Sequence, residues 1–157
     1  LRAIGTCRDI TEQRKLEQDR SRLVHDLGER VKELNALHLA ADLLRELDRP
    51  LAEMLGGIAN ILPPAMQHPH LAAARVVYGD SIHATANWRE STAELRSEFR
   101  TLNGVSGVLQ VVYLGSAPAE AERPFLAEER KLVDSLAEML RATIDRRDAE
   151  SVMHELQ

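Results

Sequence analysis

Cysteine, aromatic residues and long apolar runs are all scarce in this chain of 157 residues. Its single cysteine, Cys7, excludes an internal disulfide and any zinc site built on several cysteines. The longest apolar run is far shorter than the roughly 18 residues that would cross a bilayer. A formal net charge of −5 provides no basic field for nucleic acid. We therefore expect neither a nucleic-acid partner nor direct contact with a membrane.

The chain starts at Leu1, without an initiator methionine, a signal peptide or a lipidation motif. We expect a part of a longer, cytoplasmic protein, with room for one domain and an appended segment. Hydrophobic residues make up 44 % of the sequence, which is enough to build a core.

Residues 11–45 carry a heptad pattern, without proline and with one glycine, Gly28. The positions expected at a dimer interface are Leu16, Leu23, Leu27, Arg30, Leu34, Leu37, Ala41 and Leu44. Because so narrow an apolar stripe needs a partner helix, we expect a homodimer through a parallel coiled coil. The alternative is a long helix packed on its own domain, which the broader apolar surface after Leu37 favours for the last turns.

The period of the pattern changes after this segment. A second helix is expected over 51–62, because Pro50 is tolerated in a first turn and Pro63-Pro64 closes the segment. Strands are expected over 74–78, 82–88, 94–100 and 107–114. The last of these is almost continuously apolar, which predicts a central position in the sheet. A final helix is expected to open at Pro124.

This order of elements predicts an α+β fold with an antiparallel sheet. Short connections make successive strands antiparallel. Helices from both ends of the chain are expected to pack on one face of the sheet, with the first and last helices side by side.

Four segments occur in a familiar order and spacing: "HPHLAAARVVYGD" (68–80), "HATANW" (83–88), "GVLQVVYL" (107–114) and "RPFLAEERKL" (123–132). Together they resemble the GAF domain, in a subclass found in bacterial multi-domain sensor kinases. The stretch "IGTCRDITEQRKLE" (4–17) resembles the end of a PAS domain, where a final strand leads through Asp-Ile-Thr into an outgoing helix. The stretch "LGERVKELNAL" (27–37) resembles the signalling helix between sensor modules of two-component proteins.

The resemblance implies a PAS end (1–10), a signalling helix or coiled coil (11–45), a GAF domain (46–147) and an outgoing linker helix (148–157). Without a PAS sheet, residues 1–8 are expected to be disordered or extended. The implied function is a non-catalytic sensory and signal-relay module of a bacterial two-component sensor histidine kinase, whose catalysis would belong to the parent protein. Two alternatives stay open: a structural dimerisation spacer that binds nothing, and the regulatory input of a diguanylate cyclase.

Arg75 stands in an otherwise apolar strand, and a buried arginine needs an anionic partner. That partner is either a carboxylate of this chain or an acidic ligand in the cleft where GAF domains bind small molecules. The candidate pocket residues are Arg75, Tyr78, His83, Trp88 and Tyr113. The alternative is that the aromatic ones belong to the core.

Motifs for the known GAF ligands are missing, so the cofactor is unknown, and no metal site is expected. His154 precedes Glu-Leu, as a phospho-accepting histidine commonly does. The alternative is a linker helix that leads to a further module.

Overall fold

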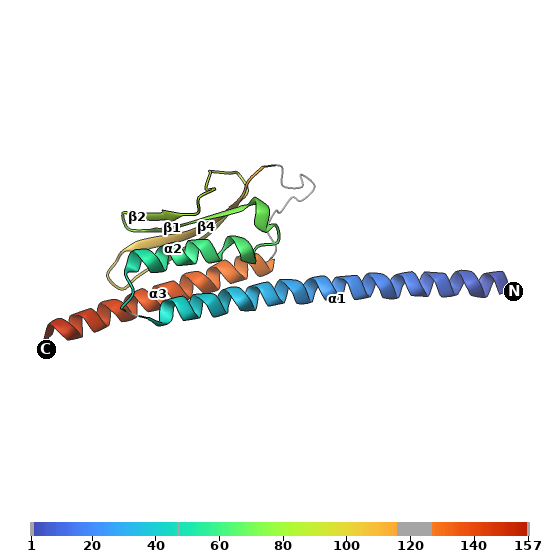
Figure 1. Ribbon diagram of the computed structural model, residues 1–157, viewed down its shortest axis with the longest axis horizontal. Coiled ribbons are helices and arrows are strands. Elements are labelled where there is room, and N and C mark those ends of the chain that lie inside the picture. Colours follow the sequence, from blue (N-terminus) through green and yellow to red (C-terminus); the bar gives the residue numbers. More distant parts are fainter. Residues whose placement is uncertain (1, 47, 116–126, 157) are drawn as a thin grey trace.

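A computed structural model describes residues 2–46, 48–115 and 127–156, with side chains for 12–46, 48–115 and 127–153. The elements follow one another as α1 (Arg2–Arg45), α2 (Leu51–Ile61), η1 (Pro63–Ala65), η2 (Pro69–Leu71), β1 (Ala72–Tyr78), β2 (Ser81–Ala84), β3 (Glu94–Arg100), β4 (Ser106–Tyr113) and α3 (Ala127–Leu156). Figure 1 shows a layered body from which α1 extends toward its N-terminus. The prediction of an α+β chain with a four-stranded antiparallel sheet is confirmed. The expected start of the last helix, Pro124, lies outside the described residues.

The four strands form one antiparallel sheet in the order β2-β1-β4-β3. β4 is central, as its apolarity predicts, and pairs with β1 on one side and β3 on the other. Strand alternation gives the sheet two faces. The inner face, which meets the helices, carries Val76 of β1, Phe99 of β3 and Leu109 of β4. The outer face carries the residues between them, including Arg75 and Gln110, which are paired across the strands.

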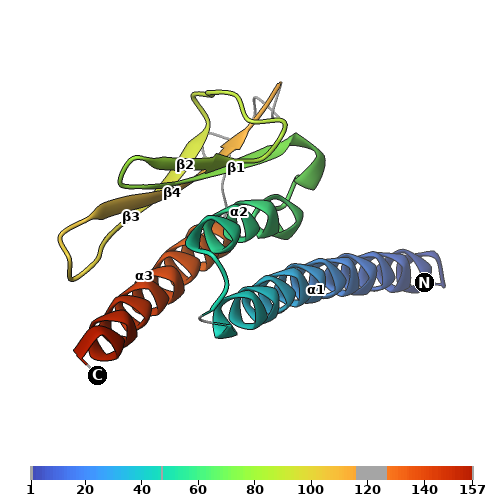
Figure 2. The same ribbon diagram turned by 60° about the vertical axis from the view of Figure 1, so that its left-hand side comes forward.

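Helices α2 and α3 cover the inner face, with α2 against β1 and β2 and α3 against β3 and β4. α1 packs on α2, α3 and η1, and Figure 2 shows α2 and α3 between it and the sheet. The expectation that helices from both ends would share one face therefore holds for α3, whereas α1 forms a third layer. α1 and α3 contact each other and run in the same direction, so their free ends point away from the body on opposite sides (Figure 1).

α3 supplies the largest helical share of the core. Its fully buried side chains begin with the neighbours Leu132 and Val133 and then recur three or four residues further on, at Leu136, Leu140 and Ile144. This spacing places them on one side of a helix, as the sequence predicts. They meet inner-face residues of β3 and β4 and the buried side chains of α2, so one continuous core joins sheet and helices.

Residues 2–10 are helical, and the expectation of a strand or an extended segment there is wrong for the backbone of this chain. The reason is that a lone strand leaves its N–H and C=O groups without partners, whereas a helix pairs them within itself. Among the described residues, the four strands pair only with one another, so no sheet edge receives the segment.

Gly107 of β4 allows two aromatic rings to stack across it. It is the register partner of Tyr78 on one side and of Phe99 on the other. The two rings are nearly parallel, 10° apart in plane and 6.0 Å between centroids. A Cβ atom at Gly107 would lie 2.2 Å from the Phe99 ring. A glycine is therefore required here by packing.

Substitution Gly107→Ala is expected to lower the free energy of unfolding by about 1–3 kcal/mol, because the added methyl displaces the Phe99 ring. The measurement is urea denaturation followed by circular dichroism. Gly28→Ala serves as the matched control, since an added Cβ at Gly28 meets nothing within 4 Å. That change is expected to raise helix stability by about 1 kcal/mol. Equal effects of the two substitutions would contradict the ring-stacking account.

Candidate functional site

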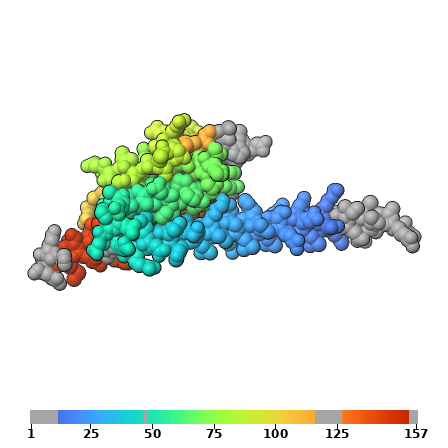
Figure 3. All heavy atoms as spheres, in the orientation of Figure 1, coloured from blue at the N-terminus to red at the C-terminus, as the bar shows by residue number. Residues whose placement is uncertain are grey.

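Helix α1 presents two different faces to its surroundings. Ala36, Ala40 and Leu44 are buried against the domain. On another side, Leu16, Leu23, Leu27 and Leu34 are 60–69 % exposed. Together with exposed Ala41 they form the α1 stripe, and Figure 3 shows the blue part of α1 extending past the body of the molecule. Because contiguous exposed apolar surface is uncommon on a protein that stays monomeric, this row is the candidate interaction surface of α1.

The structure divides the eight residues predicted for a dimer interface. Arg30 is exposed beside the stripe, and Leu37 is half-buried at its border with the domain. Leu44 is buried in the core of its own chain, so its assignment to a dimer interface is wrong. The physical reason is that the last turns of α1 lie on α2 and α3, which take up the apolar surface there. Two exposed valines beside the stripe, Val24 and Val31, were missed.

The five candidate pocket residues do not share one site. Arg75 lies on the outer face, where Trp88 covers it. Tyr78, His83 and Tyr113 belong to the inner face. The prediction of one common pocket is therefore wrong, because positions 75 and 78 are an odd number of residues apart on one strand and must point to opposite faces.

The three inner-face residues make packing contacts. The Tyr78 hydroxyl lies 3.3 Å from Thr101 Oγ1. The half-buried His83 is the register partner of Val76 and lies beside Gly56 of α2, its Nδ1 4.0 Å from the place of an added Cβ. Tyr113 is 1 % exposed. The alternative that aromatic residues serve the core thus describes Tyr78 and Tyr113.

Tyr113 and Glu129 form a buried polar contact between β4 and α3. The Tyr113 hydroxyl donates to Glu129 Oε2 at 2.5 Å and accepts from the backbone N–H of His68 at 3.4 Å. The same carboxylate oxygen accepts from the N–H of Gln67 at 3.2 Å. Burial, followed by the hydrogen bond to Glu129, raises the pKa of Tyr113 above its usual value of 10.0. The contact holds the segment before β1 against the first turn of α3.

The outer face carries a connected row of polar side chains. Arg75 Nε donates to Gln110 Oε1 at 2.7 Å, and Gln110 Nε2 donates to Glu94 Oε1 at 2.5 Å. Arg96 lies between two carboxylates, 3.8 Å from Glu94 and 3.5 Å from Glu98. The Trp88 ring covers the Arg75 guanidinium, whose carbon is 4.5 Å from the ring centroid. These polar side chains could bind a charged group, and none of them is a nucleophile paired with a general base.

The outer face also contains an open groove of about 660 Å³. Val77 and Val108, register partners on β1 and β4, belong to its lining. Arg96, Glu98 and Arg100 of β3 line it as well. The groove therefore joins an apolar floor to a charged edge, one step along the sheet from Arg75 and Gln110.

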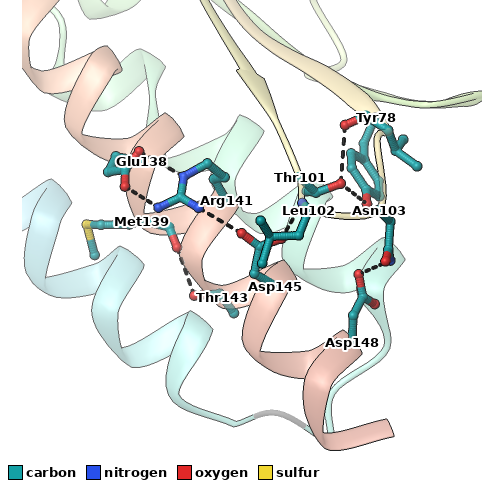
Figure 4. Close-up of polar contacts among 11 residues, drawn as sticks. Tyr78, Thr101, Leu102, Asn103, Glu138, Met139, Arg141, Thr143, Asp145 and Asp148 are labelled. Carbon is teal, nitrogen blue, oxygen red and sulfur yellow. Dashed lines mark hydrogen bonds and ion pairs between the residues drawn. The ribbon is translucent and has the colours of Figure 1, made fainter. Parts of the chain in front are cut away.

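A second polar cluster ties α3 to the β3–β4 turn, as Figure 4 shows. Asp145 Oδ1 accepts the Leu102 N–H at 2.9 Å, and Asp148 Oδ2 accepts from Asn103 Nδ2 at 2.5 Å. Arg141 binds the other oxygen of Asp145 at 2.7 Å and thereby orients it. We call these two bonds from the turn to α3 the α3–turn contact. It couples the far end of the sheet to the part of α3 that leaves the body.

Arg147, which lies between Asp145 and Asp148 in the sequence of α3, donates to the carbonyl oxygen of Arg49 in the turn between α1 and α2. It also lies 3.6 Å from Met54 Sδ of α2. The side chain of His154 lies outside the described residues. Residues 145–148 of α3 thus bind both the β3–β4 turn and the turn that follows α1.

In the described part of the chain, no three His, Cys, Asp or Glu side chains gather as a metal site would require. Within the same residues, no helix combines the length and apolarity needed to cross a membrane. No known protein family, curated protein or solved structure matches this chain. The functional argument therefore depends on its own geometry.

Removing the Tyr113 hydroxyl tests the β4–α3 contact. Tyr113→Phe is expected to lower the free energy of unfolding by about 1–3 kcal/mol at pH 7, because buried Glu129 loses a donor. Since the pKa of Tyr113 is raised on folding, its contribution is complete below about pH 10 and is lost as the pH rises toward the folded value. Urea denaturation at pH 7 and 10.5 should show the difference from the wild type shrinking. Tyr78→Phe is the control, and an equal loss there would contradict the special role of Tyr113.

Removing Asp145 tests the α3–turn contact. Asp145→Ala is expected to speed hydrogen exchange of the Leu102 amide and to cost about 0.5–1.5 kcal/mol of stability. Asp148→Ala, which leaves the Leu102 N–H paired, should change that amide less. Glu150→Ala on the next turn is the control for lost negative charge. If all three variants exchange alike at Leu102, the contact does not hold the turn.

Proposed function

We propose that this chain is a non-catalytic sensory and signal-relay module of the GAF type, dimerised through α1, from a bacterial two-component sensor histidine kinase. The phosphotransfer chemistry would belong to the parent protein. The kind of parent comes from the sequence resemblance, whereas the relay role is supported by the geometry of the two long helices.

The single observation that carries the proposal is the exposed α1 stripe. Fully burying a leucine side chain contributes roughly 1.5–3 kcal/mol. Four leucines left in water on one side of one helix are costly unless a partner covers them. A second α1 with the same repeat is the simplest partner, because heptad positions of two parallel copies meet at equal heights. The homodimer is therefore parallel in this proposal.

The relay would run from one helix to the other through the body. α1 enters the molecule on one side, and α3 leaves on the other (Figure 1). The two helices contact each other, and the α3–turn contact adds a link from α3 to the sheet. A change in the sheet would thus shift α3 relative to α1, and the paired α1 helices would convert that shift into rotation or register change.

Dimerisation is tested with the double substitution Leu23→Glu, Leu27→Glu. Two charges at facing positions are expected to weaken the dimer at least about a hundredfold, because the burial of both side chains is lost. Mass is measured by light scattering after gel filtration over a range of concentrations. Leu39→Glu is the matched control, since Leu39 is also exposed but lies outside the α1 stripe. A wild-type chain that stays monomeric at high concentration would overturn the proposal.

The direction of the pair is tested by cross-linking in the same assay. Leu16→Cys, at the N-terminal end of the α1 stripe and far from the centre of any overlap, is combined with Cys7→Ser to remove the natural thiol and is expected to form a disulfide between copies under mild oxidation. In a parallel coiled coil, equivalent positions lie within the Cα separation that a disulfide allows. In an antiparallel pair they do not meet except at the centre of the overlap. Absence of the cross-link in a confirmed dimer would exclude the parallel arrangement.

A further inference from the structure

Arg75 carries a charge that no acidic side chain of the described residues neutralises directly. Its Nε donates to the amide oxygen of Gln110, and its guanidinium lies over the Trp88 ring. Within the described ranges, no carboxylate lies within ion-pair distance of its guanidinium. Glu94, the acid at the other side of Gln110 in the row, is engaged by Gln110 and Arg96. A guanidinium has five N–H donors, and Gln110 takes one, so an incoming anion would find donors available.

Arg75 is also held in place before any ligand arrives. Gln110 fixes its Nε edge, and the guanidinium carbon lies over the Trp88 ring, 4.5 Å from the ring centroid. The loop that carries Trp88 is bonded to the sheet, because Asn87 donates to the Ala72 carbonyl and Ser91 donates to the Tyr113 carbonyl. Binding to a group that is already oriented loses little conformational entropy. The planar fork of an arginine suits the two oxygens of a carboxylate.

An apolar surface lies next to this cation. The Val77 and Val108 pair is one step along the outer face from Arg75 and Gln110 and belongs to the groove described above. Among the outer-face charges Arg75, Glu94, Arg96, Glu98 and Arg100, three positive and two negative charges leave a net +1. A small anion with an apolar body matches both parts.

We propose that Arg75 and Trp88 form the head-group site for a small organic carboxylate whose apolar body lies over Val77 and Val108. This inference rests on the proposed sensory function and names the chemical class of its ligand. The step is binding alone, with no bond made or broken. Arg75 would supply the charge and the bidentate donors, and Trp88 would hold the guanidinium flat.

The chain offers a direct optical test, because Trp88 is its only tryptophan. We would titrate the full chain with hexanoate and follow Trp88 fluorescence. The expected result is a saturable change, with acetate and hexanamide each needing at least about tenfold higher concentration. Acetate lacks the apolar body and hexanamide lacks the charge, so each removes one half of the proposed recognition. A response without saturation, or equal responses to hexanoate and hexanamide, would overturn the site.

Inorganic phosphate separates the proposed class from general anion binding. If phosphate competes as well as hexanoate, the assignment to a carboxylate with an apolar body is wrong. Arg75→Gln is expected to weaken hexanoate at least about tenfold, since a charge-assisted bond is lost. Arg89→Gln, which removes the same charge from an exposed position beside Trp88, should leave the affinity within about twofold. Equal losses in the two variants would reduce the effect to overall charge.

Arg75→Lys keeps the test valid if Arg75→Gln does not fold. Lysine retains the charge but lacks the planar fork, so the Arg75→Lys variant is expected to bind hexanoate about tenfold more weakly than the wild type. An unchanged affinity in Arg75→Lys would overturn the bidentate geometry. Light scattering of the same samples separates this inference from the relay. Hexanoate binding to a monomeric chain would support the carboxylate site and refute the dimeric relay. A dimer that does not bind hexanoate would support the dimer and refute the carboxylate site.

Discussion

The close approach of α1 to α2 and α3 is the contact on which the rest of the structure depends. Ala36 and Ala40 are almost completely covered there, and their small side chains let helix backbones come near one another. A larger residue at either position would push α1 away and open the core beneath it. Because only the last part of α1 is anchored in this way, the same helix is a core element at one end and carries an exposed apolar stripe at the other.

The parts of the molecule that could be predicted from sequence are those whose pattern lies within a single element. Alternating charge in β3 and continuous apolarity in β4 indicate their strands and, for β4, its central place. The periodic stripe of α3 indicates its buried side. These predictions agree with the structure because each pattern depends only on residues within one strand or one helix. Leu44 was misassigned because heptad position alone does not say whether the partner helix belongs to the same chain.

Individual residues of the candidate site could be singled out from sequence, but which of them meet in the fold could not. Arg75 was singled out as a cation in need of an anionic partner, but among the described residues its contacts are the amide of Gln110 and the Trp88 ring. It was also grouped with Tyr78, although strand alternation separates them. Gln110 and Glu94, which connect to Arg75, gave no signal, because cross-strand register decides their meeting and single strands do not reveal register. The α3–turn contact was likewise hidden, since it joins residues 43 and 45 positions apart in the chain.

The sheet itself provides a physical route between the proposed ligand and the helices. In β4, Gln110 faces Arg75 on the outer side, while its neighbours Leu109 and Val111 are buried on the inner side. A ligand that moves Gln110 must therefore also disturb the packing against the helices, because one backbone carries both. Such a ligand can shift the helices only by the difference between its affinities for the two arrangements. Since the α3–turn contact consists of two exposed hydrogen bonds, each worth about 0.5–1.5 kcal/mol, a modest difference in affinity is sufficient to release it.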